Sequence, residues 1–352
     1  MSARYLGRKA LGALVTIFLI VTLNFVLFRM MPGSPERILL RNPYLSPEVI
    51  EATREAWGLN DPLLPIVIKT KPEAEADCVF GPDCRVNVYL TADNQLFAYY
   101  GAILRGDLGY SLKYRGQPVT EVIAESLWPT VLLIGLAEIV AIVVGLSVGS
   151  YAGWKRGGKA DRVGSGISLI LYSMPYFVIG MPLIIIFANT LGWFPTSGMW
   201  TLGATYSSPL DALLDLASHL ILPLTTVALG LIGGYSILMR SSIIETRAED
   251  YVTTARAKGL SDNRILRAHA FPNALLPMVT IIAINLGYVV AGAITAEVVF
   301  NWPGLGTLTV EALSARDYPV LQGIFLLVSI AVVVANFSAD IVYGFLDPRV
   351  RA

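Results

Sequence analysis

Histidine, cysteine and charge are all scarce in this sequence. It holds two cysteines and two histidines among 352 residues, and only 15% of its residues are charged. The motifs H-E-x-x-H and G-x-S-x-G are missing, and no cluster of metal-ligand spacing occurs, which argues against a zinc or serine hydrolase. The formal net charge is +0, so no global charge favours nucleic acid as a partner.

A phosphate-loop spacing occurs once, without the chemistry that it needs. Residues 153–159 read GWKRGGK, which has the spacing G-x4-G-K. Ala160 stands where a phosphate loop has the Ser or Thr that binds magnesium, and an apolar run rather than a buried strand precedes the segment. We therefore interpret it as a basic turn and expect no cofactor in this chain. If ATP drives this protein, another chain must bind it.

Apolar sequence, in contrast, is abundant. Hydrophobic residues make up 55% of the chain, above the roughly 45–50% of soluble domains. A helix needs about 20 apolar residues to cross about 30 Å of hydrocarbon. Six runs are long enough, at 10–31, 129–153, 164–191, 218–240, 276–300 and 319–345. The sequence therefore predicts an all-α polytopic membrane protein with six transmembrane helices. The third and sixth runs have the length to tilt or to contain a non-spanning turn.

The positions of the basic residues predict the orientation. Basic residues precede the first run, as they precede the apolar core of a secretory signal. The run is longer than such a core and no cleavage site follows it, so we expect a retained helix. Short cytoplasmic loops carry an excess of Lys and Arg. With the N-terminus inside, the inner segments hold Arg4, Arg8, Lys9, Lys155, Arg156, Lys159, Arg162, six more between 240 and 267, Arg349 and Arg351. The short outer loops, 192–217 and 301–318, hold only Arg316. We therefore expect a multi-pass protein with both termini in the cytoplasm.

Three regions follow from this reading. They are an N-terminus with an anchor helix (1–31), an extracytoplasmic segment (32–114) and a core of five helices (115–352). Within the outer segment, Cys78 and Cys84 flank a Gly-Pro turn in CVFGPDC. Two close cysteines outside the cytosol favour a disulfide over free thiols, and two ligands are too few for zinc. The surrounding lobe also holds the strand-like run VNVYL, which indicates a hairpin or an irregular lobe.

Three carboxylates lie within or near the apolar runs, where ionisable groups are costly. Glu138 lies near the middle of the second run, so it either lines a translocation pathway or joins helices by an internal hydrogen bond. Glu297 and Asp340 lie nearer the ends of their runs, where a side chain can reach the interface. All three are candidates for the pathway. Each stands alone without the paired groups that an intramembrane protease requires.

The longest polar stretch of the second half is EDYVTTARAKGLSDNRILRAHAFPN, residues 249–273. Thr246 and Glu249 have the spacing of a capping box, which predicts a helix from 247. Gly259 suits the left-handed position at its end, Ser261 can cap a second helix, and Pro272 should prevent that helix from continuing. Two capped helices with small faces favour a protein-docking element. The alternative is an amphipathic surface element attracted to anionic lipid.

The same stretch resembles the cytoplasmic EAA loop of the membrane subunits of bacterial ABC importers, with the pattern E-A-A-x3-G-x9-I-x-L-P. Aligned on Gly259, this chain matches the pattern at Ala255, Gly259 and Pro272. It departs at four positions, which hold Thr253, Thr254, His269 and Phe271. The variant DY-x-x-TARAKGL…HA-x-x-NALLP is similar to the dipeptide and oligopeptide permease branch, B-type. Further similarities are MPGSP, GDLGYSL, AEVVFNWPGLG, ARDYPVLQG and the ending DIVYGFLDPRVR.

This resemblance implies a type I importer permease with a MetI-like fold, in a bacterial inner or plasma membrane. It implies a second homologous permease subunit, two cytosolic ATPases that bind ATP and Mg²⁺, and an extracytoplasmic solute-binding protein that delivers a peptide. The chain itself would then be non-catalytic. It also implies a coupling loop, residues 241–275, which meets the ATPase through Glu249, Asp250, Tyr251, Ala255, Ala257, Gly259, His269, Pro272 and Asn273.

Other functions stay open on the residues alone. The same architecture could import a nickel chelate, glutathione or an oligosaccharide, since no residue forms a recognisable peptide pocket. A secondary carrier would use the carboxylates for proton coupling and would need no ATPase. A membrane scaffold or receptor would bind partners and move no solute. The position of the lobe around residues 70–95 suggests a contact with the binding protein.

Overall fold

The computed structural model describes residues 3–30, 61–72, 84–90, 94–114 and 116–346. Internal contacts divide the chain into two compact units. Unit 1 comprises Met1–Ile17, Ile123–Ala312 and Leu327–Ala352, and unit 2 comprises Phe18–Val122 and Leu313–Leu326. The predicted disulfide cannot be followed in the structure, because Cys78 lies outside the described residues.

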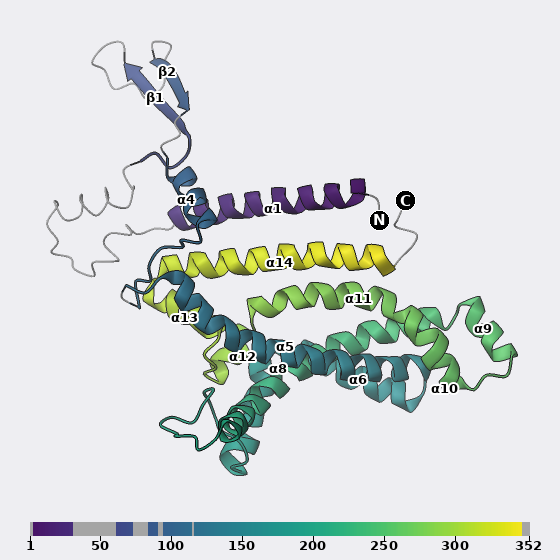
Figure 1. The fold of residues 1–352 in the computed structure, drawn as a ribbon. Helices are drawn as coiled ribbons and strands as arrows, with labels where there is room; N and C mark the ends of the chain where they lie inside the picture. The colour runs from purple at the N-terminus through teal and green to yellow at the C-terminus, as the bar shows by residue number, and fades with distance from the viewer. Residues whose placement is uncertain (1–2, 31–60, 73–83, 91–93, 115, 347–352) are drawn as a thin grey trace. The chain divides into compact units, whose positions relative to one another are not determined.

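Long apolar helices dominate the described chain (Figure 1). The continuous helices with a candidate membrane span are α1 (Ala3–Met30), α5 (Val119–Trp154), α8 (Pro209–Thr246), α11 (Phe271–Tyr288) with its flanking turns, and α14 (Tyr318–Leu346). α5 has 36 residues and α8 has 38. At about 1.5 Å per residue both exceed about 30 Å of hydrocarbon, so their ends project beyond it. Predicted helical membrane architecture is confirmed, and the sixth run proves to be one uninterrupted helix.

The third predicted run is broken. α6 (Lys159–Ser173) and α7 (Tyr176–Leu183) with the π-helix η1 (Ile184–Thr190) form a bent pair, with an angle of 101° between its arms. Pro175 stands at the break, where it cannot continue the hydrogen bonding of α6 and restricts the residue before it to extended geometry. The described residues therefore contain five continuous spans, or six when this pair counts as one.

Glycines allow α5 and α8 to approach closely. Gly149 and Gly153 lie one turn apart on α5. A Cβ atom at Gly149 would lie 2.4 Å from the carbonyl oxygen of Ser236, and one at Gly153 would lie 2.8 Å from that of Arg240. No side chain larger than hydrogen fits there, so the two backbones are in direct contact. This contact fixes how the two longest helices of unit 1 lie against each other.

The fifth span ends earlier than the sequence indicated. α11 leads into the 3₁₀ turn η3 (Val289–Ala291), and Gly292 with φ +73° breaks the helix. A separate short helix, α12 (Ile294–Val299), and α13 (Leu305–Ala315) follow. The predicted run 276–300 was therefore wrong at its end, because a residue in the left-handed region cannot continue a right-handed helix.

Unit 2 contains the lobe that follows the first span. β1 (Ile66–Pro72) and β2 (Cys84–Leu90) pair antiparallel, with Ile66 opposite Leu90 and Pro72 opposite Cys84. This two-stranded sheet agrees with the expected hairpin around VNVYL. The helix α4 (Gln95–Leu104) begins at Asn94, whose side chain accepts a hydrogen bond from the amide of Phe97. Fully buried Asp317 accepts bonds from the Ser111 hydroxyl and neighbouring amides, so it organises the GDLGYSL segment.

Candidate functional site

The predicted coupling loop, residues 241–275, contains a helix that differs from the expected one. α9 covers Asp250–Ala257, and its N-cap is Glu249, which makes no side-chain capping bond. The predicted capping box at Thr246 is wrong, because α8 continues through Thr246 and keeps that side chain buried. The amide of Glu249 donates to the Thr246 carbonyl over 3.2 Å, which closes a tight turn between the two helices.

The end of α9 follows the prediction. Gly259 has φ +77°, the left-handed conformation that L-amino acids with side chains rarely adopt. Its amide donates to the carbonyl of Arg256 over 3.0 Å, which satisfies one of the free carbonyls at the helix end. The bend after α9 therefore depends on this glycine.

The second half of the loop is not a separate helix. α10 (Asp262–Ile265) passes into the π-helix η2 (Leu266–Ala270) and then directly into α11. The predicted stop at Pro272 was wrong, because the helical backbone passes through Pro272, the second residue of α11, directly after the wide turn of η2. The side-chain amide of Asn273 donates to the carbonyl of His269 over 2.7 Å, so the wide turn keeps a hydrogen bond at this point.

The predicted docking residues divide into an exposed set and a buried one. Most of them are exposed: Glu249, Asp250, Tyr251, Ala257, Gly259, Pro272 and Asn273. His269 is half-buried, and Ala255 is buried against the same cluster as Val252 and Ile265. Ala255 therefore contributes its small size to packing inside the chain and offers a partner little surface.

Electrostatics on the exposed face of α9 are mixed. Glu249 and Asp250 stand at the positive end of the helix dipole, and Arg256 and Lys258 stand at its negative end. Partial burial raises the pKa of the Tyr251 phenol, and the Glu249 carboxylate adds to this shift. Tyr251 is thus a neutral hydrogen-bonding aromatic group between charges, a residue type enriched where proteins dock.

Glu138 is the first of the three pathway candidates. Only 2% of it is exposed, and the hydroxyl of Tyr235 donates a hydrogen bond to its carboxyl group. The side chain of Asn285 donates to the same hydroxyl over 2.9 Å. The three residues come from α5, α8 and α11, so in this structure Glu138 serves as an internal hydrogen-bonded link between helices.

The sequence suggested that the Glu297 side chain could reach the membrane interface. In the structure this side chain is instead fully buried in α12. The Thr130 hydroxyl donates to one carboxyl oxygen over 3.0 Å, and the Gly306 amide donates to the other over 2.7 Å. The backbone passes close to this carboxyl group at Gly304. A Cβ atom there would lie 2.4 Å from a carboxyl oxygen of Glu297, so only glycine fits. Glu297 therefore fastens the start of α13 to the beginning of α5's apolar run.

Asp340 is the exposed one of the three. Its carboxylate lies 2.8 Å from the ammonium group of Lys9, with 41% of the Asp340 side chain exposed. Both residues belong to unit 1. The interface position expected from the sequence is consistent with this exposure, and the pair joins the first and last helices of that unit.

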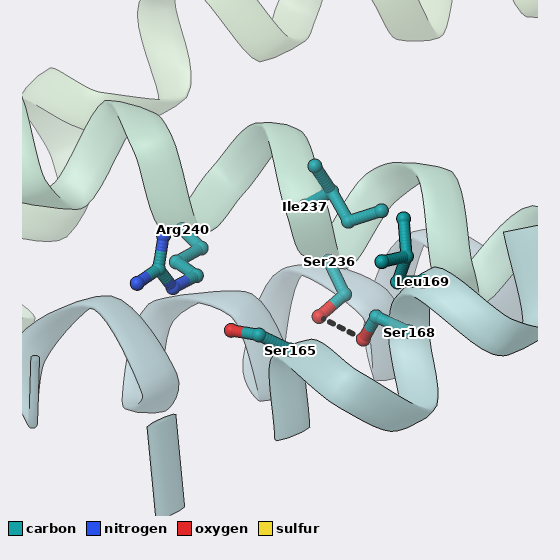
Figure 2. Close-up of a pocket in the computed structure, with 6 residues that line it drawn as sticks. All are labelled: Ser165, Ser168, Leu169, Ser236, Ile237 and Arg240. Carbon is teal, nitrogen blue, oxygen red and sulfur yellow. Dashed lines mark hydrogen bonds between the residues drawn. The ribbon is translucent and has the colours of Figure 1, made fainter. Parts of the chain in front are cut away.

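A small cavity lies between α6 and α8 (Figure 2). Its volume is about 170 Å³, and it is lined by Ser165, Ser168, Leu169, Ser236, Ile237 and Arg240. The Ser168 hydroxyl donates to that of Ser236 over 2.9 Å. A dashed line marks this bond in Figure 2. Ligand pockets usually measure roughly 300–1,000 Å³, so this cavity is too small to hold a peptide.

Beside this cavity lies an ion pair that the sequence analysis did not identify. The guanidinium of Arg240 donates to both carboxylate oxygens of Asp161, over 2.5 and 3.0 Å. One signal for it was available, because Asp161 lies shortly before one apolar run and Arg240 ends another. Charges at such positions need a partner, although the sequence does not say which one.

Two family models match this chain. The family described as "Binding-protein-dependent transport system inner membrane component" matches residues 142–352. Its N-terminal companion, "Binding-prot-dependent transport system membrane comp, N-term", matches residues 2–69.

Relatives match over the full length. The chain is 33% identical over 347 residues to a probable peptide ABC transporter permease protein, y4tP, of Sinorhizobium fredii, with 99% of each chain covered. It is 32% identical to the oligopeptide transport system permease protein AppB of Bacillus subtilis, again with 99% of each covered. It is also 32% identical to the glutathione transport system permease protein GsiC of Escherichia coli K12, with 99% of this chain and 98% of that one covered.

The fold is similar to that of a solved transporter. A chain of the MetNI methionine ABC transporter, in an inward-facing conformation, superposes with a TM-score of 0.53 at 19% identity. The match covers 66% of this chain and 99% of that one. At this identity the similarity concerns the fold alone.

Proposed function

The chain belongs to the family of binding-protein-dependent transport system inner membrane components, and we propose that it forms half of a translocation pathway for peptides. It would do so as the permease subunit of an ABC importer. The second half would come from a homologous permease subunit. The observation that carries the ATP-driven mechanism is the two-sided construction of α9. One side is buried against the core of unit 1, and the other presents charges and Tyr251.

This construction suits a docking site for a cytosolic ATPase. Val252 and Ala255 hold α9 to the helices of unit 1, so a force on its exposed face acts on the bundle. The residues proposed for the contact are Glu249, Asp250, Tyr251, Ala257 and Gly259. Two ATPases would bind ATP and Mg²⁺ and carry out hydrolysis, and this chain would supply no catalytic residue. Differential contacts of a few kcal/mol suffice to move a two-state gate.

Both termini and α9 lie in the cytoplasm in this proposal, on the side where most of the Lys and Arg of short loops are found. The hairpin of β1 and β2 is then extracytoplasmic. We place the solute-binding protein on that side, where the hairpin offers it a contact. Membrane lipid surrounds the exposed apolar side chains of the long helices.

Peptides are the proposed substrates because relatives over the full length are named for peptides and oligopeptides. A glutathione permease is equally similar at 32% identity, which makes short or modified peptides a second candidate class. The cavity of about 170 Å³ contributes nothing to this choice, given its size.

The test is transport by the assembled complex in proteoliposomes. The chain is reconstituted with its partner permease, both ATPases and the binding protein, and uptake of labelled dipeptide, oligopeptide and glutathione is measured with and without ATP. ATP-dependent uptake of one class supports the proposal and identifies the substrate. Uptake by this chain alone, driven by a proton gradient, would instead show a secondary carrier.

A pair of variants tests the docking surface. Tyr251→Asp places a charge on the exposed face, and Gly259→Pro cannot adopt φ +77° because proline requires a negative φ. Both should lower ATPase co-purification and peptide uptake about tenfold or more, a loss within the range of docking hot spots. Thr253→Ser, on the same helix, is the control. Unchanged uptake and co-purification in both variants would show that α9 is not the docking site.

A further inference from the structure

Two arginines near the end of α8 contact the turn that connects α5 to α6. Arg240 lies within α8, and Arg247 is its C-cap residue. They are seven residues apart, which is close to two helical turns, so both side chains leave α8 on the same side. Both reach the segment that begins at Trp154 and ends at Asp161.

The contact of Arg240 fixes the start of α6. Its guanidinium binds Asp161 through two nitrogens, a paired geometry that a planar fork forms with a carboxylate. Asp161 also accepts bonds from the Gly157 amide over 2.8 Å and from the Ser165 hydroxyl over 3.1 Å. The carboxylate is almost fully buried, so these bonds replace the water that it loses.

The contact of Arg247 fixes the end of α5. One of its guanidinium nitrogens donates to the Trp154 carbonyl over 2.9 Å, and the guanidinium carbon lies 5.7 Å from the centre of the Trp154 ring. Trp154 ends α5, where carbonyls have no partner within the helix. Trp154 is 4% exposed and belongs to the same buried cluster as Val252 and Ala255 of α9.

We propose that Arg240, Arg247, Trp154 and Asp161 form an arginine clamp, which passes a displacement of α9 to α5 and α6 as well as to α8. This inference rests on the proposed docking of an ATPase at α9. Arg247 precedes α9 by only three residues, so movement of that helix acts on the clamp at once. The clamp adds polar connections to the apolar packing that already joins α9, α5 and α8. In this proposal the four residues are positioning residues.

The experiment measures coupling in the complete complex. Peptide uptake per ATP hydrolysed is determined in proteoliposomes, together with ATPase co-purification. Arg247→Gln removes both contacts of Arg247, and Arg247→Lys keeps the charge but loses the planar group. We expect both variants to lower uptake per ATP about tenfold, a ratio within the usual range of coupling between sites. Co-purification should stay at the wild-type level. Arg156→Gln is the matched control, since Arg156 lies in the same turn between α5 and α6, is exposed and is not one of the clamp residues.

A charge exchange tests the other half of the clamp. Arg240→Asp and Asp161→Arg should each lower uptake per ATP, and the double variant should recover at least part of it, because the pair is restored with reversed polarity. Recovery would exclude general misfolding as the cause.

Three results would overturn the proposal. Wild-type coupling in Arg247→Lys would show that the positive charge at position 247 suffices and that the contacts of the planar guanidinium with Trp154 are not needed. Lost co-purification in Arg247→Gln would show that Arg247 contacts the ATPase itself. A double variant with no recovery would show that Arg240 and Asp161 do not act together. Failure of the proposed function is seen separately, as absent ATP-dependent uptake by the wild-type complex or as unchanged co-purification in Tyr251→Asp.

Discussion

The two ends of unit 1 differ in the exposure and hydrogen bonding of their carboxylates. α9 and α10 lie at one end and α12 at the other (Figure 1). At the α9 end, carboxylates such as Glu249 and Asp250 are exposed and make no bond that holds the helix start. At the α12 end, Glu297 is fully buried and accepts hydrogen bonds from Thr130 and Gly306.

The difference indicates two separate uses of polar residues in an apolar chain. A buried carboxylate with several donors contributes to stability only while all its bonds are made, and removing it leaves the donors without partners. An exposed carboxylate remains hydrated and contributes little to folding, so it is available to a partner. Changes at the α12 end should therefore alter stability, whereas changes on the exposed face of α9 should alter assembly and coupling.

The largest expected effect is at Glu297. Glu297→Ala leaves the Thr130 hydroxyl and the Gly306 amide without their acceptor, which should cost about 2–4 kcal/mol of the free energy of unfolding. Glu297→Gln should cost roughly half as much, since an amide keeps one acceptor oxygen and presents a donor to the other side. The measurement is unfolding of purified protein in mixed micelles, followed by tryptophan fluorescence.

Glu249→Ala is the matched control at the other end. Glu249 is exposed and its side chain makes no capping bond, so this change should cost less than about 1 kcal/mol. Equal losses of stability in Glu297→Ala and Glu249→Ala would contradict the division between the two ends.

The sequence predicted the outline of this comparison but not its details. The membrane spans and the bend at Gly259 could be predicted because they depend on local properties. These are hydrophobicity over about 20 residues and the freedom of glycine at positive φ. The environment of Glu297 could not be predicted, because its donor Thr130 lies 167 positions away in the chain. The continuation through Pro272 also escaped prediction, since η2 sets a helical register that no local signal reveals.

Two alanines on α9 sharpen the comparison within one helix. Ala255 is buried beside Val252 and Ile265, whereas Ala257 is exposed. Ala255→Leu should therefore overfill the contact between α9 and the core and cost about 1–3 kcal/mol. Ala257→Leu should change stability by at most about 0.5 kcal/mol.

The two alanine substitutions should affect ATPase binding and stability differently. If Ala257 lies in the ATPase contact, Ala257→Leu should reduce co-purification of the ATPase while the protein remains as stable as wild type. Unfolding in micelles and co-purification measured on the same preparations separate the two effects. A destabilised Ala257→Leu protein, or an unaffected Ala255→Leu protein, would mean that the buried and exposed faces of α9 are assigned wrongly.

A small effect on stability is also expected for the exposed pair of Lys9 and Asp340. Their charged atoms are 2.8 Å apart, yet the two side chains are 37% and 41% exposed. Water and salt screen such a pair, so Asp340→Asn should cost at most about 1 kcal/mol, and less at high ionic strength. Unfolding measured at low and at high salt tests this, because only an ion pair gives a difference between wild type and variant that shrinks with salt. A loss as large as that of Glu297→Ala would mean that burial does not determine what a carboxylate contributes here. A loss that salt leaves unchanged would mean that Asp340 acts through packing or hydrogen bonds rather than through its charge.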